Sequence, residues 1–177
     1  MSTETTDVKT DQPESTTSPA NENIERLNNA RSTVNKYAMG SMAVGLIPFP
    51  YIDFSALSTI QIQMLRHLAK QYEVEFSKET VKSLIASLFG SAVSVTAAAS
   101  LAKLVPVVGQ ASGMISMAVL GGAGTHAVGT VFIEHFESGG TLLNFEPEKV
   151  KKKFQALLEE GKQFVSAATG KTKAKEE

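Results

Sequence analysis

Few residues of this chain have a spacing that suits catalysis or metal binding. The three histidines, His67, His126 and His135, form no H-E-x-x-H or other compact ligand set, and there is no cysteine. Disulfides and thiolate metal sites are therefore excluded. His126 lies in an uncharged segment, and we interpret it as a hydrogen-bonded core residue. No Ser, His and Asp constellation can be argued from the spacings, so we expect no catalytic residue, no metal and no cofactor.

Two glycine motifs of nucleotide-binding proteins are relevant to this sequence. The sequence lacks G-x-x-x-x-G-K-[ST], so we expect neither binding nor hydrolysis of ATP or GTP. Gly122, Gly124 and Ala127 match G-x-G-x-x-A, and Glu146 follows about twenty residues later. A dinucleotide site also requires a preceding strand and several βαβ units. "ISMAVL" could be such a strand, but nothing around it supplies the rest of a sheet, so helix packing explains these glycines better.

The length and composition indicate one domain with polar ends. It has 177 residues and a net charge of −1, from 17 basic and 18 acidic side chains. This balance gives no reason to expect nucleic acid as a partner. Residues 1–22 are polar and lack the basic start and apolar centre of a signal peptide, so we expect a disordered tail that stays in the cytoplasm. Residues 169–177 are expected to form a second, short tail.

Apolar residues recur at helical spacing along the rest of the chain, which predicts an all-α fold. The four core helices are expected at 23–46, 54–72, 78–104 and 108–137. A fifth, amphipathic helix is expected within 143–168, after a helical domain at 23–142. Ser77 suits an N-cap, Gly139 and Gly140 suit a helix stop, and Pro147 suits a first helical turn.

Two proline bends divide the core helices into two helical hairpins. The tips of these hairpins are Pro48, Pro50, Asp53, Pro106 and Gly109. The residue before a proline is pushed away from helical geometry, so the chain is expected to turn at these points. The Asp53 carboxylate can accept hydrogen bonds from the free N–H groups of the helix that follows.

Small residues recur four apart on the third and fourth predicted helices. Residues at i and i+4 share one face of a helix, and a small face lets two helix backbones approach closely. The helix-packing positions are Gly90, Ser94, Ala98, Gly113, Gly121, Thr125 and Gly129. Because the bend between the two helices is short, we expect these faces to pack on each other.

The same two helices are candidates for a hairpin that crosses a membrane. Residues 83–102 and 104–133 contain no charge, and a bilayer core needs about 20 apolar residues. A tight soluble bundle would also leave its central helices uncharged, so that interpretation stays open. Lys103 stands alone at the expected far tip. The lysines expected on the near side are Lys78, Lys82, Lys149, Lys151, Lys152 and Lys153. Lysine excess on one side follows the positive-inside rule and predicts both termini in the cytoplasm.

Two long stretches also resemble a known family. "VNKYAMGSMAVGLIPFPYIDFSALSTIQIQMLRHLAKQYEVEFSKETVKSL" and "LVPVVGQASGMISMAVLGGAGTHAVGTVFIEHFESGGTL" are similar to the YcjF-type domain of uncharacterised bacterial proteins. The shared features include the Pro-x-Pro bend with Asp53, the stretch from Gln61 to Met64 and the Val-Pro-x-x-Gly bend. The resemblance implies a helical, often membrane-associated domain that is joined to, or encoded beside, Era-like GTPases. Because this chain has no GTPase domain, the resemblance implies that any GTPase involved acts in trans.

Taken together, the sequence predicts a non-enzymatic, membrane-associated helical module that binds a partner protein. Its expected place is the bacterial cytoplasmic membrane. The alternative is a cytoplasmic, soluble helical scaffold or oligomeric adaptor, in which self-association into a homo-oligomer buries the apolar helices.

Replacing Asp53 with Ala is expected to lower the free energy of unfolding by about 0.5–2 kcal/mol, because a helix N-cap is lost. Thermal or denaturant unfolding of the Asp53→Ala variant measures this. Unchanged stability would show that Asp53 does not cap the helix.

Overall fold

The structure is all-α, as the sequence predicts. The computed structural model describes residues 18–45, 54–92 and 110–173, and within these ranges every regular element is a helix. The helices are α1 (Pro19–Gly45), α2 (Phe54–Gln71), α3 (Lys78–Ala92), α5 (Gln110–Glu137) and α6 (Pro147–Lys173). The expected hairpin tips and two of the expected packing positions fall outside the described residues: Pro48, Pro50, Asp53, Ser94, Ala98, Pro106 and Gly109.

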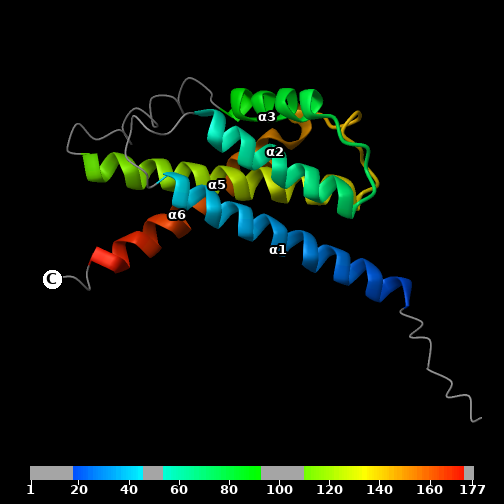
Figure 1. Ribbon diagram of the computed structural model, residues 1–177, viewed down its shortest axis with the longest axis horizontal. Coiled ribbons are helices and arrows are strands. Elements are labelled where there is room, and N and C mark those ends of the chain that lie inside the picture. Colours follow the sequence, from blue (N-terminus) through cyan, green and yellow to red (C-terminus); the bar gives the residue numbers. More distant parts are fainter. Residues whose placement is uncertain (1–17, 46–53, 93–109, 174–177) are drawn as a thin grey trace, which may run out of the picture.

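The helices form a bundle around α5, and α1 and α6, which pack most extensively on α5, both run in the opposite direction to it (Figure 1). Arg26 of α1 lies beside Glu137 at the end of α5, and Val34 lies beside Gly129 farther back along it. Residue numbers thus rise along α1 as they fall along α5, which makes the two helices antiparallel. In the same view α2 runs with α5, whereas α3 and α6 run with α1.

Local sequence signals set several helix ends. At the start of α3, the Thr80 N–H donates to the Ser77 hydroxyl at 3.4 Å, which confirms the predicted N-cap. At the end of α5, the Gly140 N–H donates to the His135 carbonyl at 2.9 Å, and Gly139 has a φ of 79°. This is a Schellman cap, in which glycine takes the left-handed conformation without steric cost. The same geometry ends α2, where the left-handed residue is Glu73, with a φ of 56°.

Aromatic contacts join α3, α5 and α6 into one core. Phe132 of α5 stacks on Phe145 with ring centroids 4.2 Å apart, and Phe154 of α6 meets Phe89 of α3 edge-on at 5.2 Å. Phe132 and Phe154 are both fully buried. The amphipathic helix therefore contributes to the same hydrophobic core as the other helices. Removing the Phe154 side chain would open a cavity in that core.

The small residues of α5 pack against α1 and not against the small face of α3. An added Cβ at Gly121 would lie 3.0 Å from the Ser41 carbonyl oxygen, and one at Gly129 would lie 2.6 Å from a Val34 methyl. Gly90 of α3 is exposed, with no atom within 4 Å of its Cβ position. For the described residues the expected seam between the two small faces is therefore wrong. The reason is that α3 turns a large side chain toward α5, where the Phe89 ring lies 3.0 Å from the Cβ position of Gly124.

We expect Gly129→Ala to destabilise the protein by about 1–3 kcal/mol, because the new methyl group overlaps Val34, whose β-branched side chain is stiff. The matched control is Gly90→Ala, which adds the same methyl group in open space on a helix and should stabilise by up to about 1 kcal/mol. Chemical denaturation of both variants measures the two effects. Equal effects would contradict the tight contact between α1 and α5.

Candidate functional site

His135 and His67 serve structural hydrogen bonds. The His135 Nε2 lies 2.9 Å from the Thr141 carbonyl oxygen and 3.0 Å from Asn144 Oδ1. Both partners are acceptors, so Nε2 carries the proton and holds the turn after α5. The His67 Nδ1 lies 2.7 Å from the Tyr37 hydroxyl, which joins α2 to α1. Within the described ranges, no group of three or more acidic or histidine side chains is placed to hold a metal ion.

The dinucleotide-like glycines lie inside α5, in the middle of the bundle. A Cβ at Gly122 would overlap the Met42 side chain of α1, and Gly124 lies under Phe89. Ala127 is fully buried in the core. These positions face protein side chains at van der Waals distance, so they do not border a space for a cofactor. His126, on the same helix, is half-buried.

One buried hydrogen bond fixes the register of α1 on α5. The hydroxyls of Ser41 and Thr125 are 2.8 Å apart, and both residues are fully buried. A buried hydroxyl without a partner costs about 1–3 kcal/mol, so sliding either helix would leave two such groups unsatisfied. Thr125 is therefore both a small packing residue and a register marker. Gly113, another predicted packing position, lies in the first turns of α5, and its side-chain surroundings are outside the described part of the structure.

A cluster of three side chains holds the opposite end of the same helix pair together. The Tyr72 hydroxyl donates to Glu137 Oε1 at 2.5 Å, and the Arg26 guanidinium lies 5.2 Å from the centre of the Tyr72 ring. Arg26 Nε is 3.9 Å from the same carboxylate oxygen. Burial raises the pKa of Tyr72 above its ordinary value, and the hydrogen bond to Glu137 raises that pKa further. The three residues join α1, the end of α2 and the end of α5.

Charge is segregated along the bundle axis. We call one end the uncharged end, defined by helix segments that carry no Asp, Glu, Lys or Arg: residues 37–45, 54–65, 83–92 and, up to the level of Ser41, 110–125. These segments lie together on one side of Figure 1, where α1 and α3 end and α2 and α5 begin. The other end, the charged end, holds the Arg26 cluster and the lysines of α3 and of the first turns of α6. The exception is α6, which carries Glu159 and Glu160 toward the uncharged end.

Lipid could not surround the whole length of the bundle without covering charges. The second half of α5, from Gly121 onward, is covered by α1, whose outer face carries the exposed Arg31 and Lys36. A charged side chain at the bilayer centre costs at least about 2.5–3.5 kcal/mol. Within the described segments, no helix combines the length and the hydropathy of a bilayer-spanning segment. The expectation that two helices cross the membrane thus gains no support from the described part of the chain.

Comparison with known proteins places the chain in a family. A family model described as "Domain of unknown function (DUF697)" matches residues 16–163. The chain belongs to the DUF697 family. It is also 34% identical, over 166 residues, to "Magnetosome membrane protein 22" of Magnetospirillum gryphiswaldense, a match that covers 92% of this chain and 83% of that protein. No solved structure matches.

The match to the DUF697 family covers the helices of the described segments from α1 to the middle of α6, so the family unit includes the first half of the amphipathic helix. The YcjF-type label and the association with Era-like GTPases remain predictions from the sequence. Sequence analysis missed the cluster around Tyr72, because its members lie on three helices and no local pattern links Arg26, Tyr72 and Glu137.

The Tyr72→Phe variant of this DUF697 protein is expected to be less stable by about 1–2 kcal/mol near neutral pH, because it lacks a hydrogen bond to a carboxylate. The folded-state pKa of Tyr72 is raised above the unfolded value of 10.0, so this stabilisation is complete below pH 10 and is lost as the pH rises further. The difference between wild type and variant should therefore shrink above pH 10. Denaturant unfolding at pH 7, 9, 10 and 11 measures it, and a difference that stays constant would contradict the role of the hydroxyl.

Proposed function

We propose that this protein is a non-enzymatic, membrane-associated helical module that touches lipid with the uncharged end of its bundle and binds a partner protein with the rest. The segregation of charge along the bundle axis is the observation that supports this proposal. The name of the relative, a magnetosome membrane protein, agrees with a membrane setting. The proposed location is the bacterial cytoplasmic membrane.

Exposed side chains at the uncharged end can enter the interfacial region of a bilayer without a charge penalty. On α1 they are Met39, which is 71% exposed, and Ala43. On α3 they are Ala86 and Gly90. The two chain segments that connect helices at this end, 46–53 and 93–109, are mostly apolar in sequence and contain one charged residue each. A lipid-facing end therefore does not conflict with the local chemistry.

The basic residues suit an orientation in which the charged end faces the cytoplasm and the uncharged end faces lipid. Lys78 and Lys82 lie on α3, and four lysines lie in the first half of α6, all toward the charged end. We propose that this end remains in the cytoplasm, in agreement with the positive-inside rule. The second half of α6 extends beyond the bundle on the side of the uncharged end (Figure 1).

For the partner we propose a GTPase of the Era-like class that acts in trans, because the sequence resemblance points to that class. The protein itself would supply a binding surface and no catalytic group. A self-associating, soluble scaffold is the competing function, and the membrane experiment separates the two.

The proposal predicts that the purified protein floats with vesicles of phosphatidylethanolamine and phosphatidylglycerol in a density gradient. The double variant Met39→Glu, Ala43→Glu should reduce the bound fraction at least about tenfold, because each carboxylate disfavours transfer toward the hydrocarbon by up to about 3 kcal/mol. The matched control is Leu143→Glu, at a residue that is 86% exposed at the charged end and should not affect flotation.

Because Met39 and Ala43 are exposed, their variants should keep the thermal stability of the wild type, which calorimetry verifies. If the wild type remains at the bottom of the gradient, or if the Leu143→Glu control loses binding as strongly as the double variant, the membrane role is wrong. A stable oligomer in the absence of lipid would then favour the scaffold function.

A further inference from the structure

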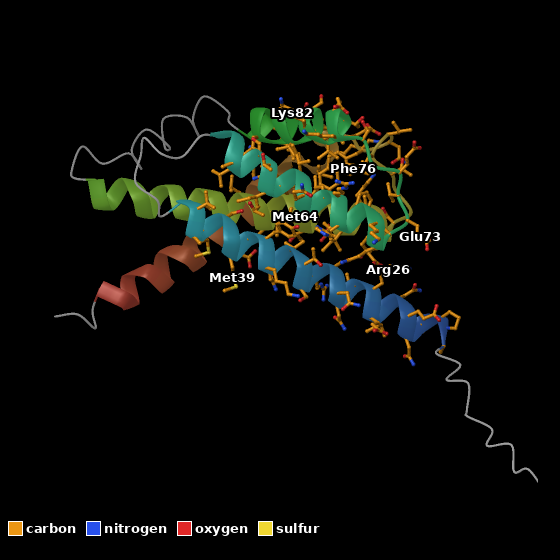
Figure 2. The ribbon with its side chains drawn as sticks, viewed as in Figure 1. Arg26, Met39, Met64, Glu73, Phe76 and Lys82 are labelled. Carbon is orange, nitrogen blue, oxygen red and sulfur yellow. The ribbon has the colours of Figure 1, made fainter. Side chains whose placement is uncertain are left out.

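A shallow groove crosses the charged half of the molecule, between α2 and residues 72–79. It consists of two neighbouring depressions of about 540 and 480 Å³ that share Gln63, Arg66 and Phe76. We call it the α2–α3 groove. Ile62 and Val74 contribute apolar atoms to its floor, and both are half-buried. Figure 2 shows Phe76 on the connection between α2 and α3, close to Glu73.

The shape of the groove is fixed by the helix ends beside it. The left-handed cap at Glu73 turns the chain sharply after α2, and the Val74 N–H donates to the Ala69 carbonyl at 2.8 Å. Four residues later the Ser77 cap starts α3. Between these two caps, Phe76 is held against α2, where the Arg66 guanidinium lies 5.9 Å from the centre of its ring. A guanidinium on an aromatic face keeps its N–H edge available for a carboxylate.

The groove is rich in cations that no carboxylate neutralises. Arg66, Lys70 and Lys78 line it and are exposed, and none of them forms an ion pair with another described residue. The lining contains a single carboxylate, that of Glu79. By contrast, three of the four lysines in the described first half of α6 form ion pairs, as Lys149 does with Glu146 at 2.7 Å. Three unpaired cations around an apolar floor complement an acidic segment that also carries apolar side chains.

We infer that the α2–α3 groove binds an acidic segment of a partner protein, whose carboxylates meet Arg66 and Lys70 and whose apolar side chain covers Phe76. This inference rests on the proposed function, since it names the surface through which the module would bind its partner. Ile62 and Gln63 belong to the uncharged segment of α2, but Arg66, Lys70 and Phe76 lie beyond it, so these groups stay accessible when the tip of the uncharged end is in lipid. The mixed lining favours a peptide over a simple anion, because phosphate alone would leave the apolar floor uncovered.

A fluorescent ten-residue peptide of alternating glutamate pairs and leucines is the probe, and fluorescence anisotropy without lipid is the measurement. The wild type should bind it, and binding should weaken as salt screens the charges. The double variant Arg66→Glu, Lys70→Glu should weaken binding at least about tenfold. The matched control is Arg31→Glu, Lys36→Glu, which reverses one arginine and one lysine on the exposed face of α1 and so changes the net charge equally.

Two altered peptides test the chemistry of the occupant. Replacing every glutamate with glutamine, or every leucine with serine, should each weaken binding several-fold, because the groove uses both charge and apolar contact. Hydrogen–deuterium exchange should show peptide-dependent protection of residues 72–78 in the wild type alone. A peptide that does not bind, or that binds both charge-reversed proteins equally, overturns the inference. Because the assay contains no lipid, its failure leaves the flotation result and the membrane proposal standing, and failed flotation leaves the groove standing.

Discussion

The close approach of α1 to α5 is the constraint on which the rest of the bundle depends. Glycines on α5 let the α1 backbone approach to a distance at which an added methyl group would overlap Val34 or Met42. Dispersion contacts are gained along the stretch where the two helices overlap, and they fall off steeply when a gap opens. The hydrogen bond between Ser41 and Thr125 then fixes the register, because any slide would strand two buried hydroxyls. The other helices pack around this pair.

This constraint also explains why the two ends of the bundle can differ in chemistry. With α1 and α5 in one register, the uncharged segments of four helices come to lie at the same end, and Arg26 comes to lie beside Tyr72 and Glu137 at the other. A buried or half-buried charge needs a partner, and the charged end supplies one to Arg26. The uncharged end needs no such partner. A membrane contact at one end and a protein contact near the other are therefore compatible in one rigid unit.

The match to the DUF697 family runs from the start of α1 into α6, so it includes both helices of this contact. The glycine positions that resembled a dinucleotide motif belong to the α1–α5 contact and to the contact with Phe89. The role of these glycines is steric, because the helices can pack this closely only where no side chain intervenes. A glycine-rich pattern without a sheet around it is thus better explained by helix packing than by a nucleotide site.

The sequence by itself determined the all-α class, the approximate helix bounds and several caps, because helical periodicity and capping are local properties that depend on residues within one or two turns. Ser77 and Gly139 are examples. It also singled out Gly121, Thr125 and Gly129 as a small face. Only the tertiary structure decided that this face meets α1 and not α3, because a small stripe is complementary to any closely approaching helix, and the choice depended on where Phe89 and Val34 lie. The tertiary structure also decided the cluster of Arg26, Tyr72 and Glu137 and the groove at Arg66 and Phe76. Both join residues from separate elements, and no spacing along the chain encodes a distance across a bundle.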